Sequence, residues 1–69
     1  MTLHEALKSI PGDTLLQSHL DGKQATAADI LVAVRDERGY EVSQASRNYG
    51  REKYVVIYIP GTGPVYSQA

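Results

Sequence analysis

Four polar side chains between positions 44 and 51 have the types and the spacing of residues that read DNA bases. They lie at positions i, i+3, i+4 and i+7, so a helix at about 43–50 would carry along one face Gln44, Arg47, Asn48 and Arg51. Arginine matches the O6 and N7 edge of guanine, whereas glutamine and asparagine match the N6 and N7 edge of adenine. Interpreted as a helix, this segment is a candidate to enter the major groove of duplex DNA.

Hydroxyl and ammonium groups around this segment suit the phosphates of the same DNA. Ser43 stands where the N-cap would lie and Ser46 lies in the first turn, so their hydroxyls and the free amides of that turn are expected to bind phosphate. Lys53 and Thr62 complete the expected phosphate contacts. The predicted DNA-binding residues are therefore Ser43, Gln44, Ser46, Arg47, Asn48, Arg51, Lys53 and Thr62.

The distribution of charge supports a nucleic-acid partner better than the total charge does. The formal net charge is -1. Residues 43–69 nevertheless hold three cations, Arg47, Arg51 and Lys53, against Glu52 alone. One positive face on a nearly neutral molecule would explain this separation, and so would a chance scatter of few charges.

Residues 40–52 have a second interpretation, as one arm of a β-hairpin. Tyr40 and Val42 would share one face of a strand, but Gln44 and Ser46 follow them there, so that face loses its apolar character. Three residues form helices poorly and suit a turn: Asn48, Tyr49 and Gly50. We prefer the helix and keep the hairpin as the alternative.

The first ten residues predict a helix. Thr2 can cap it and Glu5 completes a capping box. An apolar face follows at helical spacing, formed by Leu3, Ala6, Leu7 and Ile10. Pro11 and Gly12 are expected to end this helix.

A second, shorter helix is predicted at about 13–20. Asp13 can cap it, and Asp21 and Gly22 break the pattern after it. Its apolar face would consist of Leu15, Leu16, His19 and Leu20. On this interpretation, His19 is a half-buried residue of the core.

The strongest helical pattern lies at about 26–38. Thr26 and Asp29 form a pair that resembles a capping box, and Gly39 is well placed to end the helix. Its apolar face would consist of Ala27, Ile30, Leu31 and Val34. Residues 23–25 are expected to add a short edge strand before it.

Residues 53–67 predict a β-hairpin, because YVVIYIP and PVYSQ flank the turn GTG. One face of the first strand carries Val55, Ile57 and Ile59, and the other carries Tyr54, Val56 and Tyr58. The chain itself can bury only one of these faces in a hairpin packed on helices. The face with Tyr54, Val56 and Tyr58, extended by Tyr66, is therefore a candidate protein interface unless the N-terminal helix covers it.

Taken together, residues 26–67 resemble the N-terminal DNA-binding domain of bacterial arginine repressors. The matching positions are Gly39, Tyr40, Val42, Ser43, Gln44, Ala45, Ser46, Pro60, Gly61, Gly63 and Tyr66. The resemblance implies an α+β fold, a winged helix-turn-helix of three helices with a short extra strand and a C-terminal β-hairpin as the wing. Arg47, Asn48, Tyr49 and Gly50 depart from the family, so neither its base preference nor its arginine sensing is implied.

The residues outside these patterns do not suggest an enzyme, a metal site or a cofactor. His4 and His19 lie in different predicted helices, and the chain has no cysteine. Asp36, Glu37 and Glu41 are expected at a solvated helix end without apolar surroundings, which does not suit catalytic carboxylates. No apolar stretch approaches the roughly 20 residues that cross a bilayer, so we expect a cytoplasmic protein that does not bind membranes.

The sequence thus predicts a single domain over residues 1–69 that binds duplex DNA as a transcriptional regulator. A domain this small buries only about 60% of the surface of its unfolded chain, so a homodimer on paired half-sites is also expected. The alternative is a protein-protein interaction module, of the kind by which a mobile element such as a phage inhibits a host protein. Its interface would be formed by Tyr54, Val56, Tyr58 and Tyr66.

Overall fold

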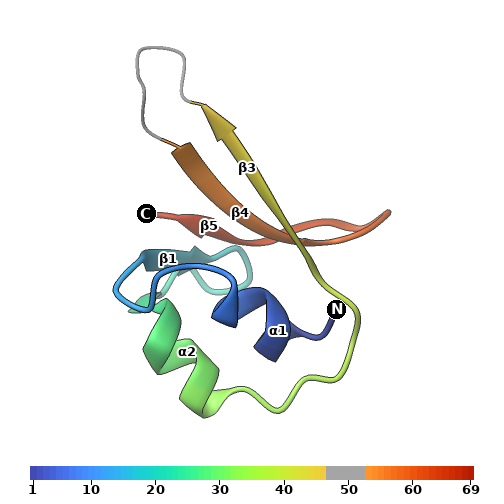
Figure 1. Ribbon diagram of the computed structural model, residues 1–69, viewed down its shortest axis with the longest axis horizontal. Helices are drawn as coiled ribbons and strands as arrows, with labels where there is room; N and C mark the ends of the chain where they lie inside the picture. The colour runs from blue at the N-terminus through green and yellow to red at the C-terminus, as the bar shows by residue number, and fades with distance from the viewer. Residues whose placement is uncertain (47–52) are drawn as a thin grey trace.

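The computed structural model describes residues 1–46 and 53–69, and the side chains of residues 1–43 and 54–69. Two helices cover one face of a five-stranded antiparallel sheet (Figure 1). The helices are α1 (Leu3–Lys8) and α2 (Ala27–Ala33), and the strands are β1 (Leu15–Ser18), β2 (Gln24–Thr26), β3 (Glu41–Ser46), β4 (Lys53–Ile59) and β5 (Gly63–Gln68). The strand order is β2-β1-β5-β4-β3. The prediction of a winged helix-turn-helix with three helices and a wing is therefore wrong.

The first helix is confirmed. Thr2 is the N-cap of α1, and its hydroxyl accepts a hydrogen bond from the backbone N–H of Glu5 at 3.2 Å. The face predicted from the spacing of apolar residues is the buried one, with Leu3, Ala6 and Leu7 in the core.

The second predicted helix, at 13–20, is wrong because this segment contains β1, the first strand of a β-hairpin with β2. Leu16 is fully buried while Leu15 is 42% exposed, as expected of neighbours on a strand. Asp21 and Gly22 turn the chain back: the Asp21 carboxylate accepts the N–H of Lys23 at 3.0 Å, and Gly22 adopts a φ of 74°. The short edge strand expected at 23–25 is present as β2, one residue later.

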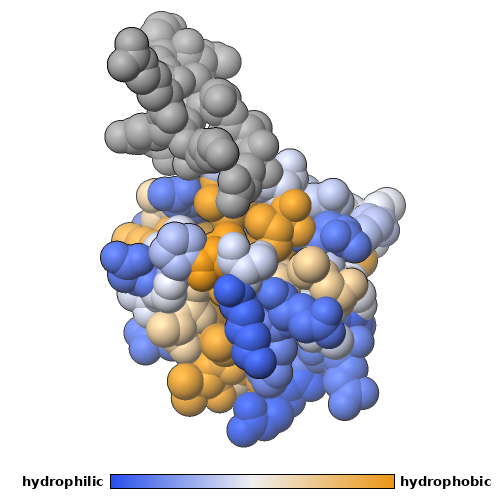
Figure 2. Space-filling model, viewed as in Figure 1, coloured by the Kyte–Doolittle hydropathy of each residue, from blue (hydrophilic) through white to orange (hydrophobic). Residues whose placement is uncertain are grey.

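The predicted helix at 26–38 is real but shorter. Thr26 caps α2 by accepting the N–H of Asp29 at 3.2 Å, and α2 ends at Ala33 because Val34 is extended, with a ψ of 140°. Hydrophobic residues reach the surface over α2 (Figure 2), where Val32 is 77% exposed.

A hydrogen-bond network replaces the last turns of that predicted helix. The Asp36 carboxylate accepts bonds from the Arg38 guanidinium at 2.7 Å and from the Tyr40 hydroxyl at 2.6 Å. These bonds from Arg38 and Tyr40 hold the pKa of Asp36 well below its usual range. The loop that they stabilise carries the chain into β3 and places the Tyr40 ring in the core, where it is 1% exposed.

The predicted recognition helix at 43–50 is also wrong, because residues 41–46 form β3. Val42 pairs with Ile57 and Ser43 with Val56, so the strand borders the most apolar strand of the sheet. A helix at 43–50 would have had only Ala45 and Tyr49 to bury, and the ladder with β4 replaces it.

The predicted hairpin at 53–67 is confirmed as β4 and β5. Two glycines with positive φ reverse the chain: Gly61, at 81°, lies in the turn and Gly63, at 117°, begins β5. The hairpin is not a wing, however, because β5 lies in the middle of the sheet, between β1 and β4.

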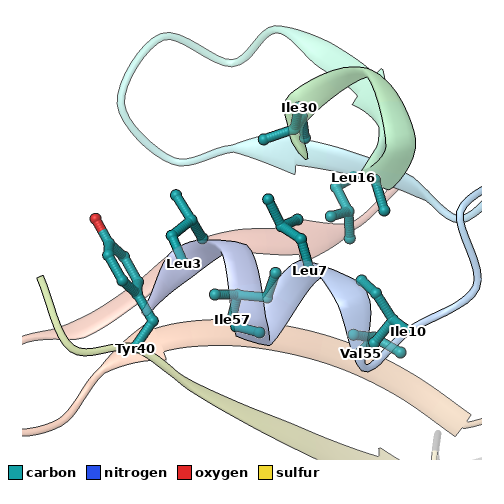
Figure 3. Close-up of a cluster of buried hydrophobic side chains, with 10 residues drawn as sticks. Leu3, Leu7, Ile10, Leu16, Ile30, Tyr40, Val55 and Ile57 are labelled. Atoms are coloured by element: carbon teal, nitrogen blue, oxygen red, sulfur yellow. The ribbon is translucent and has the colours of Figure 1, made fainter. Parts of the chain in front are cut away.

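The core lies between the helices and one face of the sheet. Leu3, Leu7 and Ile10 from the N-terminal part of the chain meet Val55 and Ile57 of β4 (Figure 3). One face of β4 therefore packs in the core, and its other face points away from the helices.

Candidate interaction surface on the open face of the sheet

The face of the sheet that points away from the helices carries a row of large side chains. Val55 and Ile57 are buried against α1, at 7% and 0% exposure, so alternation directs their neighbours to the opposite side. These neighbours are Tyr54, Val56 and Tyr58, all half-buried, and we call them the tyrosine row. We call their side of the sheet the open face.

The neighbours of the tyrosine row on the open face are small or polar. Tyr58 lies opposite Glu41 on β3 and opposite Pro64 on β5. Val56 lies opposite Ser43 on β3 and Ser67 on β5. The two tyrosine rings therefore flank an aliphatic residue whose own cross-strand neighbours are serines.

A hollow of about 400 Å³ lies beside this row, with Gln17, His19, Tyr54 and Ser67 among its lining residues. The imidazole Nε2 of His19 and the hydroxyl of Ser67 are hydrogen-bonded at 2.5 Å. Ser67 is 9% exposed although it lies in register with Val56 and Gln17 on the open face. The hollow thus offers hydrogen-bonding groups next to Tyr54, at one end of the tyrosine row.

Sequence reasoning missed the pairing of His19 with Ser67. The two residues are 48 positions apart, and no local pattern brings them together. His19 is exposed and follows a strand, so its assignment as a half-buried residue on a helix was wrong.

Tyr66 does not join the other three predicted interface residues. A β-bulge between Ile57 and Tyr58 shifts the register, so that Tyr66 pairs with Ile57 rather than with Val56. A shift of one residue turns a side chain to the other face of a sheet. Tyr66 therefore lies on the helix side, and the open face keeps Tyr54, Val56 and Tyr58.

The predicted DNA-binding residues are spread over both ends of β4. Ser43, Gln44 and Ser46 lie on β3, and Lys53 begins β4. Thr62 lies exposed in the turn after β4, so the length of that strand, roughly 20 Å, separates it from Lys53. Three predicted base-reading residues lie outside the described residues: Arg47, Asn48 and Arg51.

The described residues contain neither a metal-binding cluster nor a helix that could span a membrane. No group of three or more His, Asp or Glu side chains in residues 1–46 and 53–69 is placed to hold a metal ion. Neither helix in this part of the chain is long and apolar enough to cross a bilayer.

No family model, curated protein or solved structure matches this chain.

Proposed function

We propose that this protein is a small interaction module that binds a partner protein through the open face of its sheet. The observation that carries the proposal is the tyrosine row, which lies half-buried on β4 while both helices pack on the other face. Contiguous apolar surface on a small protein is commonly a binding site.

The residue types of the row fit this role. Tyrosine is enriched in protein interfaces because it combines a large rigid ring with a hydroxyl that donates and accepts hydrogen bonds. Tyr54 and Tyr58 are four residues apart on an extended strand, which places them roughly 13 Å apart with Val56 between them. The matching partner surface has an apolar ridge for Val56 and hydrogen-bonding groups toward both rings.

The partner can be captured with a photocrosslinking amino acid. We expect p-benzoylphenylalanine in place of Tyr58 to give an adduct of defined mass in cells that produce the protein. The same residue in place of Lys8, which is exposed on α1, should not give that adduct. The proposal fails if position 58 gives no adduct or if position 8 gives the same one.

The captured partner then permits a quantitative test with purified proteins. Tyr58→Arg should weaken binding by more than about tenfold, because a buried tyrosine at an interface commonly contributes about 2 kcal/mol or more. Isothermal titration calorimetry measures this change, with Lys8→Ala as the matched control that should bind like the wild type. Equal affinity of the Tyr58→Arg protein would remove the tyrosine row from the interface.

Binding of duplex DNA is the second candidate function. The element that would bind is the β3–β4 ribbon, not the helix expected at 43–50. In Figure 1, β3 and β4 extend away from the two helices, and the sequence between them contains Arg47 and Arg51. A two-stranded β-ribbon can enter the major groove.

Fluorescence anisotropy with a labelled mixed-sequence duplex tests this second function. A DNA-binding ribbon should give a dissociation constant of about 10⁻⁴ to 10⁻⁶ M, which weakens between about 50 and 200 mM salt because bound cations are released from the phosphates. The Arg47→Ala, Arg51→Ala double variant should bind more weakly and with a smaller salt dependence. An absence of binding at about 100 μM protein and 50 mM salt would exclude this function.

A further inference from the structure

An apolar groove lies on the helix side of the sheet, between the β1–β2 hairpin and α2. Its volume is about 400 Å³. Its apolar walls are formed by Ala25, Ile30, Ala33, Val34 and the ring of Tyr66, and Leu20 lies at its border. Two of these side chains belong to α2 and one to the middle strand of the sheet, so ordered elements hold the groove open.

The rim of the groove is more acidic than basic. Asp21 and Asp29 line it together with Lys23, and all three side chains are exposed. Burial raises the pKa of Tyr66 in the groove wall, and the negative charges of Asp21 and Asp36 raise it further. A ligand with an aliphatic side chain next to a cation would match both the lining and the rim.

The chain itself carries such a group on the hairpin that borders the groove. Leu20 is 93% exposed, the most exposed large hydrophobic side chain in the described part of the protein. Lys23 follows it three positions later. The turn that presents them is held by hydrogen bonds, from the Leu20 N–H to the Ser18 hydroxyl at 3.1 Å and from the Gly22 N–H to the Ser18 carbonyl at 3.0 Å.

Leu20 borders its own groove but does not fill it, because a side chain that is 93% exposed makes few contacts. We infer that Leu20 occupies the groove of a second copy of the chain. A two-fold axis beside the hairpin makes the contact self-complementary, since each copy gives one leucine and receives one. Lys23 of each copy then approaches the acidic rim, Asp21 and Asp29, of the other.

This contact goes beyond the proposed function and does not compete with it. Ser18 and Tyr66 lie opposite each other on the helix side of the sheet, whereas the tyrosine row lies on the open face. A dimer formed through the grooves leaves both open faces accessible to partners.

Sedimentation velocity between about 10 μM and 1 mM protein tests the inference. For the wild type, the weight-average molecular mass should rise toward twice the monomer mass as the protein concentration increases. Leu20→Ser should raise the dissociation constant of the dimer by more than about tenfold, because each dimer loses two buried leucines. Because Leu20 is almost fully exposed, this variant should keep the far-UV circular dichroism of the wild type.

Matched variants distinguish this contact from general adhesion of exposed apolar residues. Val32→Ser removes another exposed aliphatic side chain, 77% exposed on α2 and outside the groove lining, and should dimerise like the wild type. Lys23→Glu should weaken the dimer, whereas Lys8→Glu on α1 should not. A protein that stays monomeric at 1 mM overturns the inference, as does equal weakening by Leu20→Ser and Val32→Ser.

Discussion

Replacing Ile57 with alanine should lower the free energy of unfolding by about 2 to 5 kcal/mol. The Ile57 side chain is fully buried and lies on β4 between the neighbouring strands and α1 (Figure 3). Its truncation removes apolar contacts and leaves a cavity that the surrounding strands cannot close. A domain of 69 residues has a total stability of only roughly 3 to 10 kcal/mol, so this variant should be largely unfolded at moderate urea concentrations.

Urea denaturation followed by far-UV circular dichroism measures this loss. Val56→Ala is the matched control, because Val56 directly precedes Ile57 on the same strand but lies half-buried on the open face. Its substitution should cost less than about 1 kcal/mol. If both variants lost stability equally, the assignment of the two faces of β4 would be wrong.

The second large effect is expected at Tyr40. Tyr40→Ala should lower the free energy of unfolding by about 3 to 5 kcal/mol, as truncation of buried aromatic residues commonly does. The ring is 1% exposed and lies beside Leu3 in the core (Figure 3). Urea denaturation at neutral pH measures this loss directly.

Tyr40→Phe separates the hydroxyl from the ring and makes the effect depend on pH. The variant keeps the packing but loses the hydrogen bond to Asp36, so it should be less stable than the wild type at neutral pH. Because the pKa of Asp36 is lowered in the folded state, this bond stabilises the fold above about pH 4, where the carboxyl of an unfolded chain is ionised. The contribution is lost as the pH falls through the lowered pKa.

Thermal unfolding of the wild type and of Tyr40→Phe between about pH 7 and pH 2 measures how their difference in stability depends on pH. The midpoints of the wild type and of Tyr40→Phe should converge below about pH 4. A difference that stays constant over the whole range would show that the Asp36 carboxylate does not take part.

The elements that the sequence predicted correctly are those with local signals. Thr2 and Glu5 define the start of α1, and the β-branched run of β4 with its glycine turn defines the last hairpin. These signals act over a few residues and do not require knowledge of distant neighbours.

The segments that were predicted wrongly have two local interpretations of similar strength. Asp21 and Gly22 end a helix as well as they turn a hairpin, and β1 is held as a strand on one side by pairing with β5, from the far end of the sequence. The polar spacing at 44–51 fitted a helix, but it contained little that a helix could bury. Cross-strand pairing with Val55 and Val56 gives this segment an apolar neighbour that no local pattern reveals.

The candidate surface was predicted only in part, because some of its contacts depend on long-range pairing rather than on local signals. Alternation along a single strand identified Tyr54, Val56 and Tyr58. The face of Tyr66 depended on a bulge, and the hollow depended on His19 meeting Ser67 across the sheet. Register and long-range contacts are properties of the folded chain, so the sequence alone could not provide them.

The strand order also bears on how the chain is synthesised. β5 follows every other strand in the sequence, yet it lies between β1 and β4 in the sheet. A ribosome releases the N-terminal residues first, so α1 and the β1–β2 hairpin emerge before the strand that joins them to β4. Leu3, Leu7 and Leu16 have no complete core to enter until residues 63–68 are released. The sheet therefore cannot form until β5 has left the ribosome, and during that interval these side chains offer an apolar surface to chaperones.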